Sequence, residues 1–149
     1  MNTISLPNAQ HDTPSSRYAI FKTVGAAMAA LGTWFFVATV LNLALRASWP
    51  HYHEAETAFN FTLAMKVGRL VLGAISSLGA GFVAAWIGKD RMKAAATVTG
   101  IVLLGLFIPG HYLLWSKFPI WYHLTFLVSL LPLTLLGSAL YQRTCQKAA

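Results

Sequence analysis

Residues 20–45 read IFKTVGAAMAALGTWFFVATVLNLAL, and this apolar run decides the fold class of the chain. It has a single charged residue, Lys22, near its start, and Arg46 follows its end. A helix needs about 20 residues to cross a hydrocarbon core of about 30 Å, so the run is long enough to span a membrane. The long side chain of Lys22 can reach the interface. We therefore predict a membrane-spanning helix over 20–45.

Three further apolar runs follow, at about 62–88, 94–115 and 120–141. The four-residue link SKFP joins the last two and permits only a tight antiparallel hairpin. Backbone groups in lipid must be hydrogen-bonded internally, so all four runs are expected to be helices. We predict an all-α integral membrane protein, a four-transmembrane-helix bundle over 18–143, with polar cytoplasmic tails at 1–17 (disordered) and 144–149.

Composition agrees with lipid as the main solvent for this chain. Hydrophobic residues make up 56% and charged residues only 10%, whereas a soluble domain has about 25% charged residues. The net charge is +7, but the basic residues gather at the ends of the apolar runs and form no nucleic-acid patch. The single cysteine, Cys145, excludes a paired-thiol redox motif.

Basic residues in short loops predict the orientation. With four crossings, seven of them fall on the side of both termini and four on the other side, so both termini are expected in the cytoplasm. Trp49, Trp115 and Trp121 would form an outer aromatic belt and Trp86 an inner one. The aromatic stretch HYLLWSKFPIWYH at 111–123 is typical of small bacterial inner-membrane proteins, and we expect a multi-pass protein of that membrane.

Four histidines would lie at the outer side. His111 and His123 are each six residues from Lys117, the centre of the hairpin, so they reach the same depth and can face each other. His51, His53 and Glu56 lie in the loop after the first helix. Imidazole and carboxylate bind zinc or copper, and facing histidines can bind haem. These five residues are a candidate metal site, although their spacing matches no recognised signature. The alternative is ordinary hydrogen bonding and a solvated loop.

Two more patterns stand out in the second run. Lys66 and Arg69 share a helix face and are costly in lipid. They either pair with the loop acids Glu54 and Glu56, bind an anion or lipid headgroup, or extend to the interface. Small residues recur every four positions and allow close helix packing, within the chain or against another protein. These are Gly73, Ser77, Gly81 and Ala85.

No carboxylate lies deep in any run, which argues against a proton-coupled exporter. No nucleotide-binding loop and no catalytic serine motif is present either. The leading interpretation is therefore a non-enzymatic accessory subunit or binding module with an outward-facing polar and histidine-containing pocket, in contact with lipid and with other subunits or copies of itself. The alternatives are a metal- or haem-binding redox protein or enzyme that uses the outer histidines, and an oligomeric transporter or channel for an anionic solute.

Overall fold

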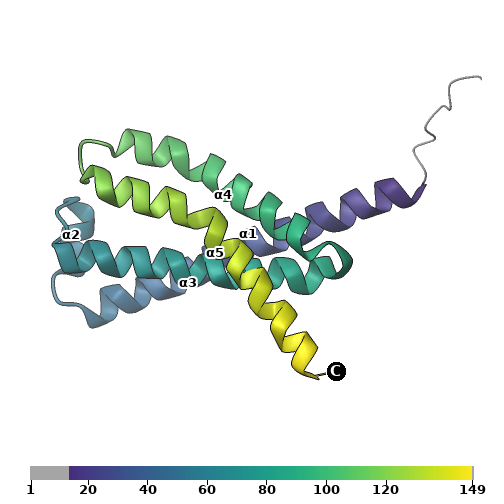
Figure 1. Cartoon of the computed structure of the whole chain (residues 1–149). Coiled ribbons are helices and arrows are strands. Elements are labelled where there is room, and N and C mark those ends of the chain that lie inside the picture. Colours follow the sequence, from purple (N-terminus) through teal and green to yellow (C-terminus); the bar gives the residue numbers. More distant parts are fainter. Residues whose placement is uncertain (1–13, 149) are drawn as a thin grey trace, which may run out of the picture.

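The computed structural model describes residues 14–148, and all of its regular elements are helical. In chain order they are α1 (Pro14–Ser48), α2 (Tyr52–Thr57), α3 (Leu63–Gly88), the 3-10 turn η1 (Lys89–Arg91), α4 (Met92–Leu113) and α5 (Ile120–Ala148). Figure 1 shows η1 and the C-terminal end of α5 at one end of the molecule, together with the start of α1. At the opposite end lie α2 and the link between α4 and α5. The all-helical prediction is confirmed within these residues.

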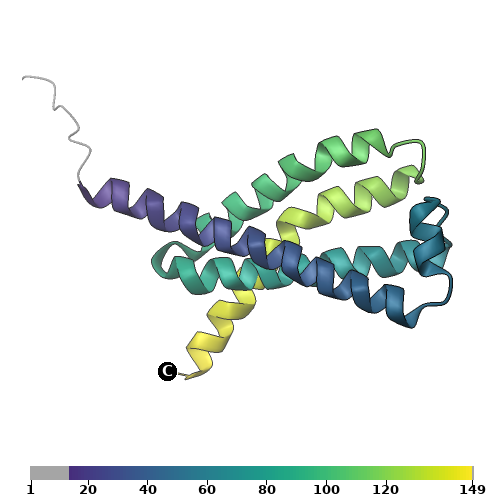
Figure 2. The same cartoon turned by 180° about the vertical axis from the view of Figure 1, so that it is seen from behind.

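Three helical stretches are long and apolar enough to cross a membrane: Tyr18–Ser48, Leu63–Leu113 and Ile120–Lys147. The middle stretch contains both α3 and α4, interrupted by η1. Lys89 begins this turn with a positive φ of 36°, and α4 runs back in the direction opposite to α3 (Figures 1 and 2). Lys22 of α1 and Asp90 of η1 form an ion pair at 3.1 Å, which places the start of α1 beside this turn.

The closest helix packing joins α3 and α5. A Cβ atom added at Gly81 would overlap the backbone of Thr134, including its carbonyl oxygen, and one added at Gly137 would overlap the carbonyl oxygen of Leu78. At Gly73 the added atom would lie 2.8 Å from the ring of Phe126. Gly81 and Gly137 let the two backbones approach within contact distance, and Gly73 leaves room for the Phe126 ring. The predicted small-residue row of α3, with Ser77 and Ala85, is buried.

Helix α3 also packs against α1. The indole Nε1 of Trp34 donates a buried hydrogen bond of 3.0 Å to the hydroxyl of Ser77. That hydroxyl in turn donates to the carbonyl of Gly73 in its own helix, at 2.8 Å. Since a buried polar group costs free energy unless it is hydrogen-bonded, these bonds allow two polar side chains to lie between apolar helices.

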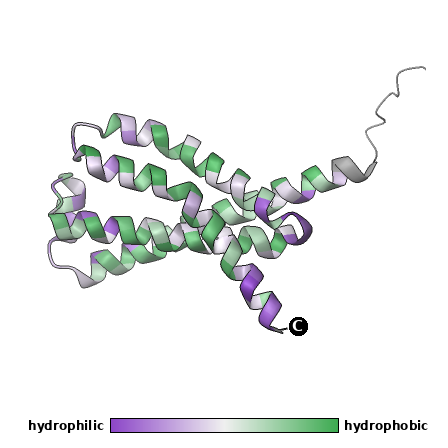
Figure 3. Ribbon diagram, in the orientation of Figure 1, coloured by the Kyte–Doolittle hydropathy of each residue, from purple (hydrophilic) through white to green (hydrophobic). Residues whose placement is uncertain are grey.

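The outer surface of the helices is apolar. Val128 is 70% exposed and Leu113 79% exposed, and large hydrophobic side chains of all four long helices are exposed in the same way. Figure 3 shows hydrophobic residues along most of the length of the long helices, with hydrophilic residues at the two ends of the molecule, at η1 and the C-terminal part of α5 on one side and around α2 on the other. Such a surface is compatible with lipid contact by a small membrane protein.

The helices differ from the predicted segments at their ends. Residues 14–17, assigned above to the tail, begin α1, while the rest of that tail lies outside the described residues. At the other end α5 continues to Ala148 through 144–148, which were also assigned to a tail. A helix does not have to stop at the hydrocarbon boundary, and no proline or glycine interrupts 138–148.

Candidate functional site

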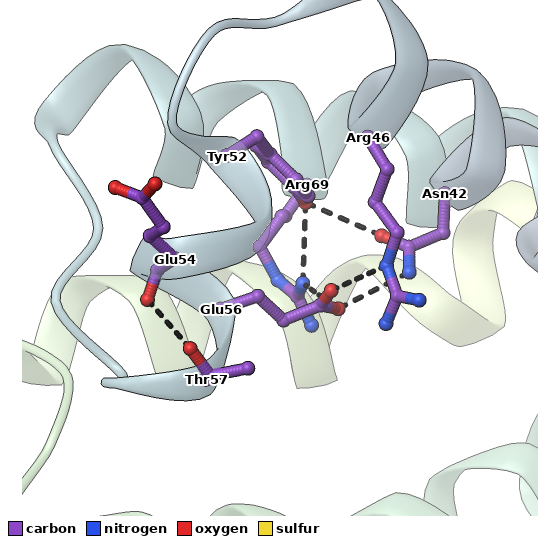
Figure 4. Close-up of polar contacts among 7 residues, drawn as sticks. All are labelled: Asn42, Arg46, Tyr52, Glu54, Glu56, Thr57 and Arg69. Atoms are coloured by element: carbon purple, nitrogen blue, oxygen red, sulfur yellow. Dashed lines mark hydrogen bonds and ion pairs between the residues drawn. The ribbon is translucent and has the colours of Figure 1, made fainter.

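A carboxylate between two guanidinium groups forms the centre of the candidate site (Figure 4). Oε2 of Glu56 accepts a hydrogen bond of 2.6 Å from Nε of Arg46, and Oε1 accepts one of 3.3 Å from Nη1 of Arg69. Oε1 also accepts a bond of 3.1 Å from the amide of Asn42. The three donors come from α1 and α3, and the acceptor comes from α2. The network therefore fastens the short helix α2 over the ends of two long helices.

Tyr52 anchors the other side of α2. Its ring is completely buried, and its hydroxyl accepts from Nη1 of Arg69 at 3.2 Å and donates to Oδ1 of Asn42 at 3.3 Å. The helix is bounded by two residues in the left-handed region, His51 with a φ of 60° and Phe59 with a φ of 52°. For residues other than glycine this region costs roughly 1–2 kcal/mol each. The contacts of Tyr52 and Glu56 hold this conformation in place.

His111 of α4 and His123 of α5 meet on the neighbouring hairpin. Their Nδ1 atoms are 2.8 Å apart, so one ring donates a hydrogen bond to the other. His123 is only 1% exposed, and its Nε2 atom has no hydrogen-bond partner among the described residues. The equal distance of both histidines from the hairpin centre allowed this pairing.

Aromatic rings enclose the histidine pair. His123 stacks on Trp115 with ring centres 4.8 Å apart, and His111 stacks on Phe126 at 4.7 Å. Tyr122, almost fully buried, lies parallel to His111 at 6.2 Å. The imidazoles are thus fixed in orientation.

A cavity of about 660 Å³ joins the two groups, a volume in the range of small-molecule sites. The charged network and α2 line one end, and His111 and His123 line the wall formed by the hairpin. The opposite end is aromatic, where Trp34 and Phe107 lie 4.7 Å apart and Phe107 and Phe126 lie 5.1 Å apart. Aromatic rings also line the charged end, where the guanidinium of Arg69 lies 4.8 Å from the centre of the Phe61 ring. The site is therefore amphipathic, with aromatic rings along its length and charge near the helix ends.

The charges of this site do not cancel. Burial raises the pKa of the Glu56 carboxyl, but hydrogen bonds from Arg46 and Asn42 and the charges of Arg46 and Arg69 outweigh it and hold that pKa below its usual value. Glu56 is therefore ionised at neutral pH. Two guanidinium groups face one carboxylate, which leaves one positive charge. In addition, Nε of Arg69 is buried without a hydrogen-bond partner among the described residues.

The predicted site residues separate into three places. Glu56 lies in the arginine network and the helical histidines form their pair, whereas His51 is exposed and contacts Glu54 at 3.1 Å. His53 is exposed as well. Within the described residues, no three histidine, cysteine or acidic side chains converge as a metal site would require. Binding of zinc, copper or haem stays a prediction from the sequence.

The two basic residues at the start of α3 have different surroundings. Arg69 pairs with Glu56, one of the two loop acids considered as its partner. Lys66 is half-buried and forms no ion pair within the described part of the chain. Of these two residues, Arg69 lines the cavity and Lys66 does not.

Sequence reasoning missed three members of the network. Arg46 was interpreted only as the residue that follows the first apolar run. Asn42 is the only carboxamide in the apolar run 20–45, and polar residues inside a membrane segment are commonly functional, so this signal was present. Tyr52 gave no signal, because tyrosine is also expected in an interfacial loop.

Comparisons with protein-family models, with curated proteins and with solved structures gave no match for this chain.

Proposed function

We propose that this chain is a four-crossing membrane protein that acts as a binding module, and that its cavity receives an amphipathic small molecule. The observation that carries the proposal is the cavity itself, which is large enough for a ligand, lined by aromatic rings along its length and charged at one end. Ligand sites commonly combine an apolar lining with a few convergent polar groups and lie between the helices of bundles.

The membrane part of the proposal rests on the apolar helices and the distribution of charge. Splitting the stretch Leu63–Leu113 at η1 gives four crossings. Basic residues are more numerous on the side of η1 and the termini, which favours that side in the cytoplasm. The cavity then lies in the outer half of the bundle. A reporter fused to the C-terminus should behave as cytoplasmic, and a reporter signal from the outer side would refute this orientation.

The binding role is tested by filling the cavity. Ala38 lines it from α1 and is partly buried, so Ala38→Trp should block the space. Ala29 lies in the same helix but is exposed outside the cavity, so Ala29→Trp is a matched control. Native mass spectrometry of the protein in lipid nanodiscs should reveal a bound amphiphile in the wild type and in Ala29→Trp, and none in Ala38→Trp. Equal ligand occupancy in all three proteins would contradict the proposal.

A further inference from the structure

The chemical class of the ligand follows from the charged end of the cavity. This inference rests on the proposed binding function and deepens it. The N–H groups of Arg46, Arg69 and Asn42 form this end, and some of them already donate hydrogen bonds to Glu56. The ligand headgroup must therefore accept hydrogen bonds from the N–H groups that remain.

Most of that capacity is still free. Each guanidinium has five N–H donors, but Arg46 uses only Nε toward an acidic group and Arg69 uses Nη1. Arg46 and Arg69 both line the cavity, and Nε of Arg69 is buried without a partner within residues 14–148. A buried donor without an acceptor is unfavourable. The Arg46 side chain, by contrast, is 41% exposed, so a ligand oxygen can reach its free N–H groups.

The charge balance specifies the sign and number of ligand charges. With Glu56 ionised, the site carries Arg46 and Arg69 against one carboxylate. A ligand with one negative charge neutralises the site, whereas a ligand with two would leave it with a net negative charge. Planar guanidinium groups pair bidentately with carboxylates and with phosphates, and the one acidic group already bound by Arg46 and Arg69 is a carboxylate. The complementary headgroup is therefore a monoanionic carboxylate.

The apolar end fixes the rest of the molecule. Trp34 and Arg46 are 12 positions apart in α1, which corresponds to about 18 Å along the helix axis. The cavity contains aromatic side chains from α1, α4 and α5 along this length: Trp34, Phe35, Phe107 and Phe126. A hydrocarbon chain fits this lining, whereas a small polar acid would leave it unfilled.

We propose that the cavity binds a carboxylate-bearing amphiphile of the fatty-acid type, with its headgroup beside Glu56 at the N–H groups of Arg46 and Arg69 that Glu56 leaves free, and its chain among the aromatic rings. Glu56 then limits the affinity, because its own charge opposes that of the ligand. Removing the charge of Glu56 should strengthen binding, and removing that of Arg46 should weaken it.

The test compares three probes in nanodiscs of phosphatidylcholine at a pH where the probe carboxyl is ionised. Oleate carries both chain and charge, oleamide has the same chain without the charge, and acetate has the charge without the chain. Binding is followed by the fluorescence of the tryptophans, of which Trp34 lines the cavity. We expect oleate to bind roughly tenfold more tightly than oleamide, as for one charge-assisted contact, and acetate to bind too weakly to detect.

Two variants give effects of opposite sign. Arg46→Gln should weaken oleate binding roughly tenfold, and Glu56→Gln should tighten it by about threefold or more, with little change for oleamide in either case. Circular dichroism and size-exclusion profiles identify any variant that does not fold. Glu56→Gln can keep the hydrogen bond from Asn42, because its side-chain oxygen still accepts one.

The outcomes separate the two proposals. Equal affinities for oleate and oleamide, with both blocked by Ala38→Trp, would refute the carboxylate assignment and leave the binding role intact. If acetate bound with the same affinity as oleate, the site would be one for free anions, and the claim that the ligand is an amphiphile would be refuted. Binding of oleate and oleamide that Ala38→Trp does not reduce would refute the proposed function itself.

Discussion

Replacing Gly81 with alanine should separate α3 from α5. The added Cβ atom would overlap backbone atoms of Thr134, including its Cα at 2.8 Å. Backbone cannot rotate away as a side chain can, so the helices must shift. Overpacking of this kind costs about 1–3 kcal/mol, and we take about 3 kcal/mol for a backbone overlap. Alanine regains up to about 1 kcal/mol of helix propensity over glycine. The net loss is about 2 kcal/mol, or about 30-fold in the folding equilibrium.

The matched control is Gly79→Ala, two residues earlier in the same helix. An added Cβ atom there meets nothing within 4 Å, so only the propensity gain remains and the variant should be stabilised by about 0.5–1 kcal/mol. Both stabilities can be measured by reversible unfolding in mixed detergent micelles. If Gly81→Ala proves as stable as Gly79→Ala, the close approach of the two backbones does not exist.

Three further predictions concern the site and the contacts that support it. The pKa of Glu56 is lowered in the folded state, so the stability that this group gives to α2 is complete above its unfolded pKa and is lost as the pH falls through the lower folded value. Proteolysis of 49–60 at decreasing pH should show this loss, and Glu56→Gln should remove the pH dependence. Trp34→Phe removes the hydrogen bond to Ser77 and should lower the free energy of unfolding by about 1 kcal/mol. A double-mutant cycle with Ser77→Ala in the same unfolding assay should give an interaction energy of this size between the two residues, whereas additive effects would show that the hydrogen bond contributes no stability. Two imidazoles alone are too few for a structural zinc site, so the purified protein should contain far less than one zinc or copper ion per chain. One metal ion per chain that is lost in His111→Ala would contradict this expectation and show that the histidine pair binds metal together with further ligands.

The sequence was sufficient for the helical class and for part of the site. Lipid leaves a backbone no other way to satisfy its polar groups, so long apolar runs imply helices. His111 and His123 follow from simple counting, because a tight hairpin brings equally distant residues to the same depth. An ion pair with a loop acid was one of the alternatives that the sequence left open for Arg69, and Glu56 is its partner in the structure.

The helix α2 was beyond sequence reasoning. Its six residues are too few to show a periodic pattern. The two positive φ angles that bound it belong to His51 and Phe59, and neither residue type signals a left-handed conformation as glycine would. That conformation depends on contacts made across the fold by Tyr52 and Glu56. For the same reason the loop histidines could not be separated from the helical pair by spacing alone.

The contact between α3 and α5 has a mechanical consequence. Gly81 and Gly137 leave no space between the two backbones, so these helices cannot move apart there without losing their packing. The cavity lies toward the α2 end of the bundle, away from this crossing. A change in the width of the cavity can therefore leave this crossing in place. The C-terminal part of α5 lies on the other side of the crossing (Figures 1 and 2), so the contact at Gly81 and Gly137 holds one end of the bundle at a set spacing while the cavity end is packed through side chains.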